Sequence, residues 1–237
     1  MNIFVLTGAG ISAESGLGTF RDKGGIWSRF DPMKLATPEA FARDPEAVHE
    51  FYNMRRRNLI GAEPNAAHDA LARLEAGVAA RGGRLFLCTQ NIDDLHERAG
   101  SRNVLHMHGE LLKARCLHCG AVMPWREDMG IADRCPSCGR TGGLRPHVVW
   151  FGEMPMGLDT IHAALAEADL FVAVGTSGSV YPAAGFVDMA RRQGIRRCEI
   201  NLEPSDNARV FTDGRYGPAT ETVPQWVDEM LGPGPGR

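Results

Sequence analysis

The chain has 237 residues, of which 43% are hydrophobic and 23% charged, with a formal net charge of −3 and an isoelectric point near 6.2. This composition is typical of a soluble globular protein and excludes a broadly basic surface that would attract nucleic acid or anionic lipid. The first apolar run is short and lacks a basic leader, and no apolar stretch approaches the length of a membrane span. We therefore expect a cytoplasmic protein.

The first candidate site follows a short apolar run at residues 2–6, which predicts a buried parallel strand. Residues 8–13 read GAGISA and fit the pattern G-x-G-x-x-G/A, in which glycines let backbone N–H groups approach a pyrophosphate. The acidic residue that usually closes the next strand is missing, because residues 24–30 carry glycines and aromatic side chains instead. Residues 19–22 (TFRD) predict a loop that covers the cofactor, and a plain surface loop with one buried Phe is the alternative.

Residues 31–83 predict a helical insert, because helix signals stand where a plain dinucleotide-binding unit would already show its second strand. Two helices begin where an N-cap residue precedes proline, at Thr37 and Asp44, and a third begins near Asn65. The basic cluster at residues 55–57 is interpreted as a solvated helix face.

A second buried strand is predicted at residues 85–88, and it runs into the polar sequence Gln90-Asn91-Ile92-Asp93. Ligands of open α/β sheets bind at the carboxyl ends of strands, so these side chains are well placed for function. Asn91 or Asp93 also fits as the N-cap of the next helix, and the two roles are compatible.

His108 ends the next predicted strand, at residues 104–109. A histidine has an ordinary pKa near 6.5, which suits a general base at neutral pH. We therefore treat His108 as a candidate base, with a structural histidine as the alternative.

Four of the six cysteines form two C-x-x-C pairs, Cys116/Cys119 and Cys135/Cys138, with fifteen residues between the pairs. Four thiolates suit a closed tetrahedral Zn²⁺ site that leaves no open coordination position. We predict one structural zinc ion in a small module. The other two cysteines lie in apolar runs and are interpreted as buried thiols.

The second half of the chain alternates strands and helices, which predicts a parallel sheet. Residues 147–153 form an extended apolar run, either a core strand or an exposed edge that accepts a peptide by strand addition. Asn201 and Glu203, at a strand end, are candidates for bonding the ribose hydroxyls that the missing acid would have held. The remaining elements are predicted at 158–168 (helix), 169–174 (strand), 175–178 (turn), 181–193 (helix), 195–200 (strand) and 224–231 (helix).

Together the motifs resemble the sirtuins, the NAD-dependent protein lysine deacylases, in family order across nearly the whole chain. The sequence Ala13-Glu14-Ser15-Gly16, with Tyr52 and Arg55, is similar to the bacterial-type class III subgroup that also removes succinyl and malonyl groups. Gly18 departs from the family pattern, because many members carry proline there. The matching pieces are residues 8–22, 90–93, 108–109, the two C-x-x-C pairs, 151–153, 175–177 and 201–203.

The resemblance implies an α/β fold in which a Rossmann-like parallel-sheet domain is joined to a smaller domain. The large domain would comprise residues 1–30, 84–110 and 147–237, and the small domain a helical insert at 31–83 and a zinc-ribbon module at 111–146. NAD and an acylated lysine would meet between them.

The resemblance also implies roles for individual residues. His108 and Asn91 would be catalytic. The substrate would contact Tyr52, Arg55, Val149, Phe151, Gly152 and Glu153, and zinc would bind Cys116, Cys119, Cys135 and Cys138. NAD would contact Gly8, Ala9, Gly10, Ser12, Ala13, Glu14, Thr19, Phe20, Arg21, Trp27, Gln90, Asn91, Ile92, Asp93, Gly175, Thr176, Ser177, Asn201, Leu202, Glu203 and Ala219.

In the reaction implied, the acyl oxygen attacks the ribose carbon as nicotinamide leaves, and His108 accepts the proton of a ribose hydroxyl. The products are free lysine and an O-acyl-ADP-ribose, and the partners are acylated proteins. We expect a monomer that binds neither nucleic acid nor membranes. The alternatives are an NAD-dependent dehydrogenase or ADP-ribosyltransferase, and a zinc-ribbon protein that binds nucleic acid, which the isoelectric point disfavours.

Overall fold

The computed structural model describes residues 1–18 and 32–232, with the side chains of residues 32 and 33 excepted. The predicted loop after the glycine turn lies outside the described residues. So do four candidate NAD contacts, Thr19, Phe20, Arg21 and Trp27.

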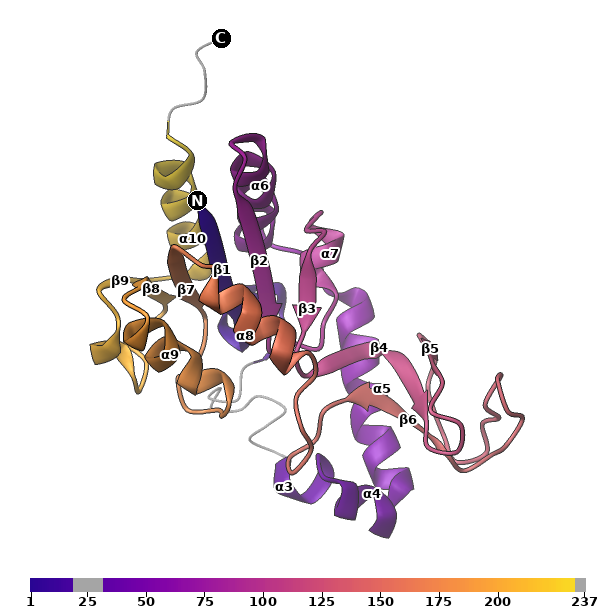
Figure 1. Cartoon of the computed structure of the whole chain (residues 1–237). Coiled ribbons are helices and arrows are strands. Elements are labelled where there is room, and N and C mark those ends of the chain that lie inside the picture. Colours follow the sequence, from indigo (N-terminus) through magenta and orange to yellow (C-terminus); the bar gives the residue numbers. More distant parts are fainter. Residues whose placement is uncertain (19–31, 233–237) are drawn as a thin grey trace.

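A six-stranded parallel sheet forms the larger part of the molecule (Figure 1). Counted within this sheet alone, the strand order is 3-2-1-4-5-6, the order of the doubly wound dinucleotide-binding fold. The order reverses between β1 and β7, and ligands of such sheets bind at that switch point. The strands in spatial order are β3 (Val104–His106), β2 (Arg84–Thr89), β1 (Asn2–Thr7), β7 (Leu170–Val174), β8 (Arg196–Asn201) and β9 (Asp213–Tyr216).

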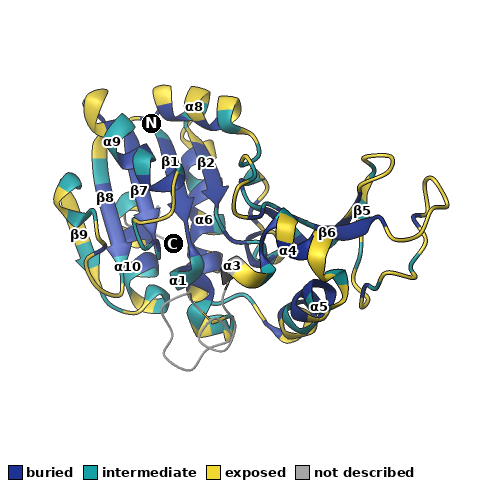
Figure 2. Ribbon diagram, turned by 90° about the horizontal axis from the view of Figure 1, so that it is seen from below, coloured by how far each residue is buried: buried dark blue, intermediate teal, exposed yellow. Residues whose placement is uncertain are grey.

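Helices cover both faces of the sheet (Figures 1 and 2). Alternate residues of the central strand β1 pack against the two helical layers. Ile3 and Val5 pack with α6 (Ala66–Ala80) and α10 (Ala219–Leu231). Phe4 and Leu6 pack on the opposite face with α8 (Leu158–Ala166), η2 (Ala183–Gly185) and α9 (Phe186–Arg192). Because both faces are buried, the strand reads as a continuous apolar run, which confirms the basis of its prediction.

The smaller part combines helices with an antiparallel sheet of three strands, in the order β5-β4-β6. Thr37 caps α4 through the amide of Ala40, at 3.0 Å, and Asp44 caps α5 through that of Ala47, at 3.0 Å, so both predicted helix starts are confirmed. The elements are α3 (Pro32–Leu35), α4 (Pro38–Arg43), α5 (Pro45–Gly61), β4 (Gly109–Cys116), β5 (Val122–Pro124) and β6 (Leu144–Val148).

The third helix of the predicted insert packs with the parallel sheet. The apolar face of α6, with Leu71, Leu74 and Val78, belongs to the same buried cluster as β1, β2 and α10. The apolar residues of α4 and α5 form a separate cluster with Trp150 and Leu111. We therefore propose that the boundary of the helical insert lies before α6, near the N-cap Asn65.

Several predicted boundaries were wrong. The strand expected at residues 147–153 is β6, which ends at Val148, and Phe151 and Gly152 lie in a turn. The strand expected at residues 104–109 is β3, which ends at His106, so His108 lies in the turn before β4. The helix expected to start at residue 181 is α9, which starts at Phe186. The last helix starts at Ala219 and carries Pro224 in its interior. Strand β9 was not predicted. The remaining short elements are α1 (Ala9–Ser12), η1 (Ala13–Ser15), α7 (Leu95–Arg98) and η3 (Ala208–Val210).

The basic cluster on α5 is not the solvated face that we expected. Arg56 is fully buried, and it donates to the Asn53 side chain at 2.6 Å and to the Leu111 carbonyl at 3.3 Å. Only Arg57 meets that expectation, because its side chain is 51% exposed. Arg56 thereby ties α5 to β4. None of the described helices is both long and apolar enough to cross a membrane.

Candidate active site

The glycine turn lies at the switch point of the sheet, and its glycines serve chain packing. The amide of Gly8 donates to Val174 at 3.0 Å and that of Gly10 to Gly175 at 2.9 Å. A Cβ atom on Gly10 would lie 2.7 Å from the Cα atom of Gly175. These two N–H groups are therefore bonded to the chain itself, which corrects the expectation that they face a pyrophosphate. The glycines bring two turns into contact at the strand ends.

Ser12 is the centre of a buried hydrogen-bond network. Its hydroxyl donates to Asp93 at 3.1 Å and accepts from the Asn91 amide at 3.1 Å. The same amide nitrogen donates to the Gly8 carbonyl at 3.1 Å, so both of its protons bond within the protein. The Oδ1 atom of Asn91 is the group that this arrangement leaves for a ligand.

His68 completes this network and was not among the predicted site residues. Its Nδ1 atom accepts from the amide of Asn65 at 3.2 Å, which leaves the proton on Nε2, 3.4 Å from the Ser12 hydroxyl. Burial lowers the pKa of His68 to about 4, so the ring is neutral. The sequence placed His68 on an apolar helix face, and only the fold brings it to Ser12.

Asp93 bonds both Ser12 and the start of the next helix, whose N-cap is Asp94 and not Asn91 or Asp93 as predicted. One carboxylate oxygen accepts from Ser12, and the other accepts from the amide of Leu95 at 3.2 Å, at the start of α7. Burial raises the pKa of this carboxyl group, and its hydrogen bonds oppose the shift. Ile92 is half-buried, and its carbonyl accepts from Leu111 at 2.8 Å.

His108 is oriented as a base by Gln90, the residue that follows β2. Its Nδ1 atom lies 3.0 Å from the Gln90 carbonyl, which can only accept, so Nδ1 carries the proton. The Nε2 atom therefore holds the lone pair that takes up a proton. Burial lowers the pKa of His108, and the hydrogen bond to Gln90 opposes that shift. The ring is thus neutral and basic at neutral pH.

The residues expected at the adenosine half surround the ends of β7 and β8. Asn201 donates to the Thr176 carbonyl at 2.8 Å and thereby joins the two strand ends. Leu202 is 67% exposed, and Glu203 and half-buried Ser177 lie beside it on the same edge. Of the other candidates, Ala9, Ala13, Gly175 and Ala219 are half-buried.

Glu14 bridges the glycine turn and the last helix. Its carboxylate accepts from the amide of Thr220 at 3.0 Å and from the Thr220 hydroxyl at 2.6 Å. This carboxylate therefore caps the N-terminal turn of α10, where a negative charge is stabilised.

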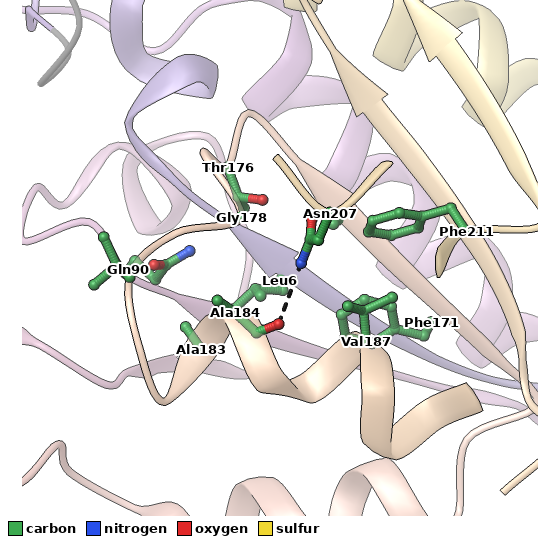
Figure 3. Close-up of a pocket in the computed structure, with 12 residues that line it drawn as sticks. Leu6, Gln90, Phe171, Thr176, Gly178, Ala183, Ala184, Val187, Asn207 and Phe211 are labelled. Atoms are coloured by element: carbon green, nitrogen blue, oxygen red, sulfur yellow. Dashed lines mark hydrogen bonds between the residues drawn. The ribbon is translucent and has the colours of Figure 1, made fainter. Parts of the chain in front are cut away.

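A small apolar pocket lies beneath the same edge of the sheet (Figure 3). Gln90 and Thr176, both candidate NAD contacts, line it together with Leu6, Phe171 and Asn207. The side chain of Asn207 donates to the Ala184 carbonyl at 3.2 Å, which holds the pocket wall against η2.

The segment after β6 lies beside the candidate base. The amide of Val149 donates to the His108 carbonyl at 2.8 Å, and that of Phe151 donates to Ala36 at 2.9 Å. Phe151 is 43% exposed and Gly152 is exposed as well. The carboxylate of Glu153 is bonded within the protein, at 2.6 Å from Arg145 and 2.8 Å from the amide of Trp150.

Tyr52 and Arg55 lie side by side on α5. The guanidinium carbon of Arg55 is 5.8 Å from the Tyr52 ring centre and 5.7 Å from that of Phe51. Burial lowers the pKa of Arg55, and the charges of Tyr52 and Asp93 oppose that shift. Burial raises the pKa of Tyr52, which is 3% exposed. A half-buried cation beside aromatic rings is an arrangement that can receive a carboxylate.

The four cysteines of the two C-x-x-C pairs converge as predicted. Their sulfur atoms lie within 4.8 Å of one another, and the Cys116–Cys138 and Cys119–Cys135 separations are each 3.8 Å. A Zn–S distance of about 2.3 Å in a tetrahedron places neighbouring sulfurs about 3.8 Å apart. The residues therefore fit a structural zinc ion. Each of the six cysteines is free, and Cys88 and Cys198 are buried.

These features define a Rossmann-like α/β protein whose sheet carries a dinucleotide site and whose smaller part carries a Cys₄ zinc module. A model of the Sir2 family matches residues 8–182, and the chain belongs to that family, the sirtuins.

The chain is 64% identical to an NAD-dependent protein deacylase of Caulobacter vibrioides, over 98% of this chain and 97% of the relative. It is 55% identical to an NAD-dependent protein deacylase of Leishmania major, over 97% and 95%. A crystal structure of a Sir2 homologue in complex with NAD has a TM-score of 0.87 to it at 41% identity, over 98% of this chain and 91% of that one.

Proposed function

We propose that this sirtuin, an NAD-dependent protein lysine deacylase, removes succinyl and malonyl groups from lysine as well as acetyl groups. The observation that carries the proposal is Arg55, half-buried on α5 with its guanidinium against the rings of Tyr52 and Phe51. A succinyl or malonyl group ends in a carboxylate, which a guanidinium holds by charge-assisted hydrogen bonds. An acetyl group offers Arg55 no such partner.

His108 is the general base of the proposed mechanism. Bound NAD supplies a ribose carbon that accepts the acyl oxygen as nicotinamide leaves. His108 then takes the proton of a ribose hydroxyl at Nε2, because Nδ1 is committed to the Gln90 carbonyl. Asn91 presents Oδ1 to the nicotinamide end, since its amide protons bond Ser12 and Gly8. The closing step consumes water, and free lysine and an O-acyl-ADP-ribose are released.

The remaining candidate contacts have distinct roles in this proposal. The turns at residues 8–14 and 175–177 hold NAD at the switch point, and residues 201–203 with Ala219 hold its adenosine half. Residues 149 and 151–153 pair with the substrate backbone, which their place beside the His108 carbonyl and the exposure of Phe151 support. Because the Glu153 carboxylate is already bonded to Arg145 and the Glu153 amide donates to the Trp150 carbonyl, this residue contributes through its backbone carbonyl.

Neither alternative activity is favoured by this site. A dehydrogenase needs no base beside the ribose and no protein substrate, and an ADP-ribosyltransferase needs no acyl pocket.

We also propose a cytoplasmic monomer that binds neither nucleic acid nor membranes. The free state of all six cysteines supports the reducing compartment, and the net charge of −3 argues against nucleic acid.

The test is the ratio of kcat/KM for succinyl-lysine and acetyl-lysine peptides in the wild type and in Arg55→Met. We expect activity on both peptides and a loss of at least roughly tenfold in the ratio, because removing one partner of a buried charge pair costs ~2–5 kcal/mol. Arg57→Met is the matched control, since Arg57 stands on the same helix with its side chain 51% exposed. An unchanged ratio in Arg55→Met would show that Arg55 does not read the acyl group.

A further inference from the structure

We propose that Trp150 is a specificity-determining residue that acts through Tyr52. Its indole N–H fixes the Tyr52 phenol as an acceptor on one side, and the phenol's own proton is thereby directed to the carboxylate of a succinyl or malonyl group. This inference rests on the proposed function, because it concerns how the same acyl site recognises its substrate.

The geometry of one hydrogen bond carries the argument. The Nε1 atom of Trp150 lies 3.0 Å from the Tyr52 hydroxyl oxygen in a buried contact. An indole N–H can only donate, so the phenol oxygen must accept. The single phenol proton then points away from Trp150, and the described residues form no second hydrogen bond to this hydroxyl.

Trp150 is held so firmly that its N–H direction is fixed. The ring is 1% exposed and packs on Phe41 with ring centres 5.3 Å apart. The guanidinium carbon of Arg145 lies 3.3 Å from the centre of the Trp150 ring. Glu153 holds that guanidinium at 2.6 and 2.9 Å and also accepts from the Trp150 amide at 2.8 Å.

The consequence is a difference between acyl groups. Burial raises the pKa of Tyr52, so the phenol keeps its proton and remains a donor. A carboxylate beside Arg55 accepts that proton as a hydrogen bond, whereas the methyl group of an acetyl-lysine cannot. Without the Trp150 N–H, the phenol is free to turn its proton toward other acceptors, and part of the preference for acidic acyl groups is lost.

The experiment is a double-mutant cycle on the ratio of succinyl-lysine to acetyl-lysine kcat/KM. It compares the wild type, Trp150→Phe, Tyr52→Phe and the double variant. Trp150→Phe should lower the ratio about tenfold, the equivalent of ~1.4 kcal/mol, because it weakens a hydrogen bond to a charged group. In the Tyr52→Phe background the same change should leave the ratio unmoved, because the hydroxyl that Trp150 orients is gone.

Controls separate this mechanism from a packing effect. Trp125→Phe removes an indole N–H from the zinc module and should not change the ratio. If Trp150→Phe fails to fold, a benzothienyl-alanine at position 150 removes the N–H and keeps the ring size. An unchanged ratio in either substituted protein, or an equal loss of ratio with and without the Tyr52 hydroxyl, overturns the inference. If Arg55→Met lowers the ratio and Trp150→Phe does not, the result contradicts the role of Trp150 and leaves the proposed acyl specificity in place. If neither variant changes the ratio, the result contradicts the proposed acyl specificity as well.

Discussion

The parallel sheet and the zinc module bury their interiors by different means. Both faces of the sheet are packed with aliphatic and aromatic side chains, and the largest cluster runs from α6 through four strands to α10. The buried cluster of the zinc module consists of Ala114, Cys116, Met129, Cys135 and Leu144, so two of its five members are predicted zinc ligands. The interior of the module is largely a metal site, because too little apolar surface is present to stabilise it otherwise.

This difference assigns separate tasks to the two regions. The sheet provides a stable edge that presents Ser12, Asn91 and His108, and its stability comes from apolar burial. The module and α5 pack together, and α5 carries Tyr52 and Arg55, the residues that we propose read the acyl group. Asn53 joins the module and α5, since its side chain bonds both the amide and the carbonyl of Met129, at 2.8 and 2.9 Å. Substitutions in the two regions should therefore impair the protein in different ways.

The largest effect is expected from the zinc ligands. Cys135→Ala should release the metal and unfold the module, because the apparent binding free energy of structural zinc is ~10–16 kcal/mol and is coupled to folding. Metal analysis, proteolysis of residues 111–146 and deacylation should all report the loss, while circular dichroism retains the helices of the sheet region. A metal-free variant that stays folded and fully active would remove the distinction between the two regions.

The second-largest effect is expected from His108, which lies where the two regions meet. His108→Ala should lower kcat/KM by ~10²–10⁴-fold with NAD binding and stability little changed, the usual contribution of a general base. Because burial lowers the pKa of His108, kcat/KM of the wild type should fall only as the pH drops through a value below 6.5. The variant should lack that acidic limb. Turnover within a factor of about two of the wild type would exclude His108 as the base.

A change within the sheet region should have a smaller effect, which acts through the packing of the glycine turn. In Gly10→Ala the new Cβ would lie 2.7 Å from the Gly175 backbone, and such overpacking costs ~1–3 kcal/mol. We expect a lower free energy of unfolding and weaker NAD binding, measured by urea titration and calorimetry, with zinc content unchanged. Gly61→Ala is the control, because no atom lies within 4 Å of a Cβ at that position. Equal stability of the two variants would mean that the turns do not need this contact.

The smallest effect is expected from a hydrogen bond at the end of β3, whose contribution to the free energy of unfolding depends on pH. His106 bonds Glu97 at 2.7 Å and the Asn91 carbonyl at 3.1 Å. Burial alone would lower the pKa of His106, but these hydrogen bonds and the Glu97 charge together raise it. The stability that protonated His106 contributes is therefore fully present below its unfolded pKa of 6.5. It is lost as the pH rises through the higher pKa of His106 in the folded protein.

Glu97→Gln tests this contribution by urea unfolding at about pH 6 and about pH 8. It should remove less than ~1 kcal/mol of stability at the lower pH, since Glu97 is 40% exposed, and almost none at the higher pH. A loss of equal size at both pH values would show that the charge of His106 is not involved.

The sequence predicted the sheet well where burial is complete. Strands β1, β2, β7 and β8 are buried on both faces, so each reads as an apolar run of strand length. Strand β9 has the sequence DGRY and lies exposed at the sheet edge, where no periodicity marks it. The start of α10 was missed because Pro224 looks like a helix start, although the first turn of the helix is already capped by Glu14.

The site was only partly predictable, because its polar contacts join distant parts of the chain. The two C-x-x-C pairs and the residues around Asn91 are visible as local patterns. His68 and Trp150 are not, since each acquires its role from a partner far away: Ser12 is 56 residues from His68, and Tyr52 is 98 residues from Trp150. Arg56 was likewise predicted to be solvated from the sequence, whereas the fold buries it against β4.

The bond between Glu14 and Thr220 makes the beginning and the end of the chain a single functional unit. The two residues are 206 positions apart, yet the carboxylate that follows the glycine turn is also the cap of the last helix. A deletion or fusion that displaces α10 would therefore release the Glu14 carboxylate and disturb the turn that we propose holds NAD. For the same reason, engineering of this protein should treat positions 14 and 220 as one site.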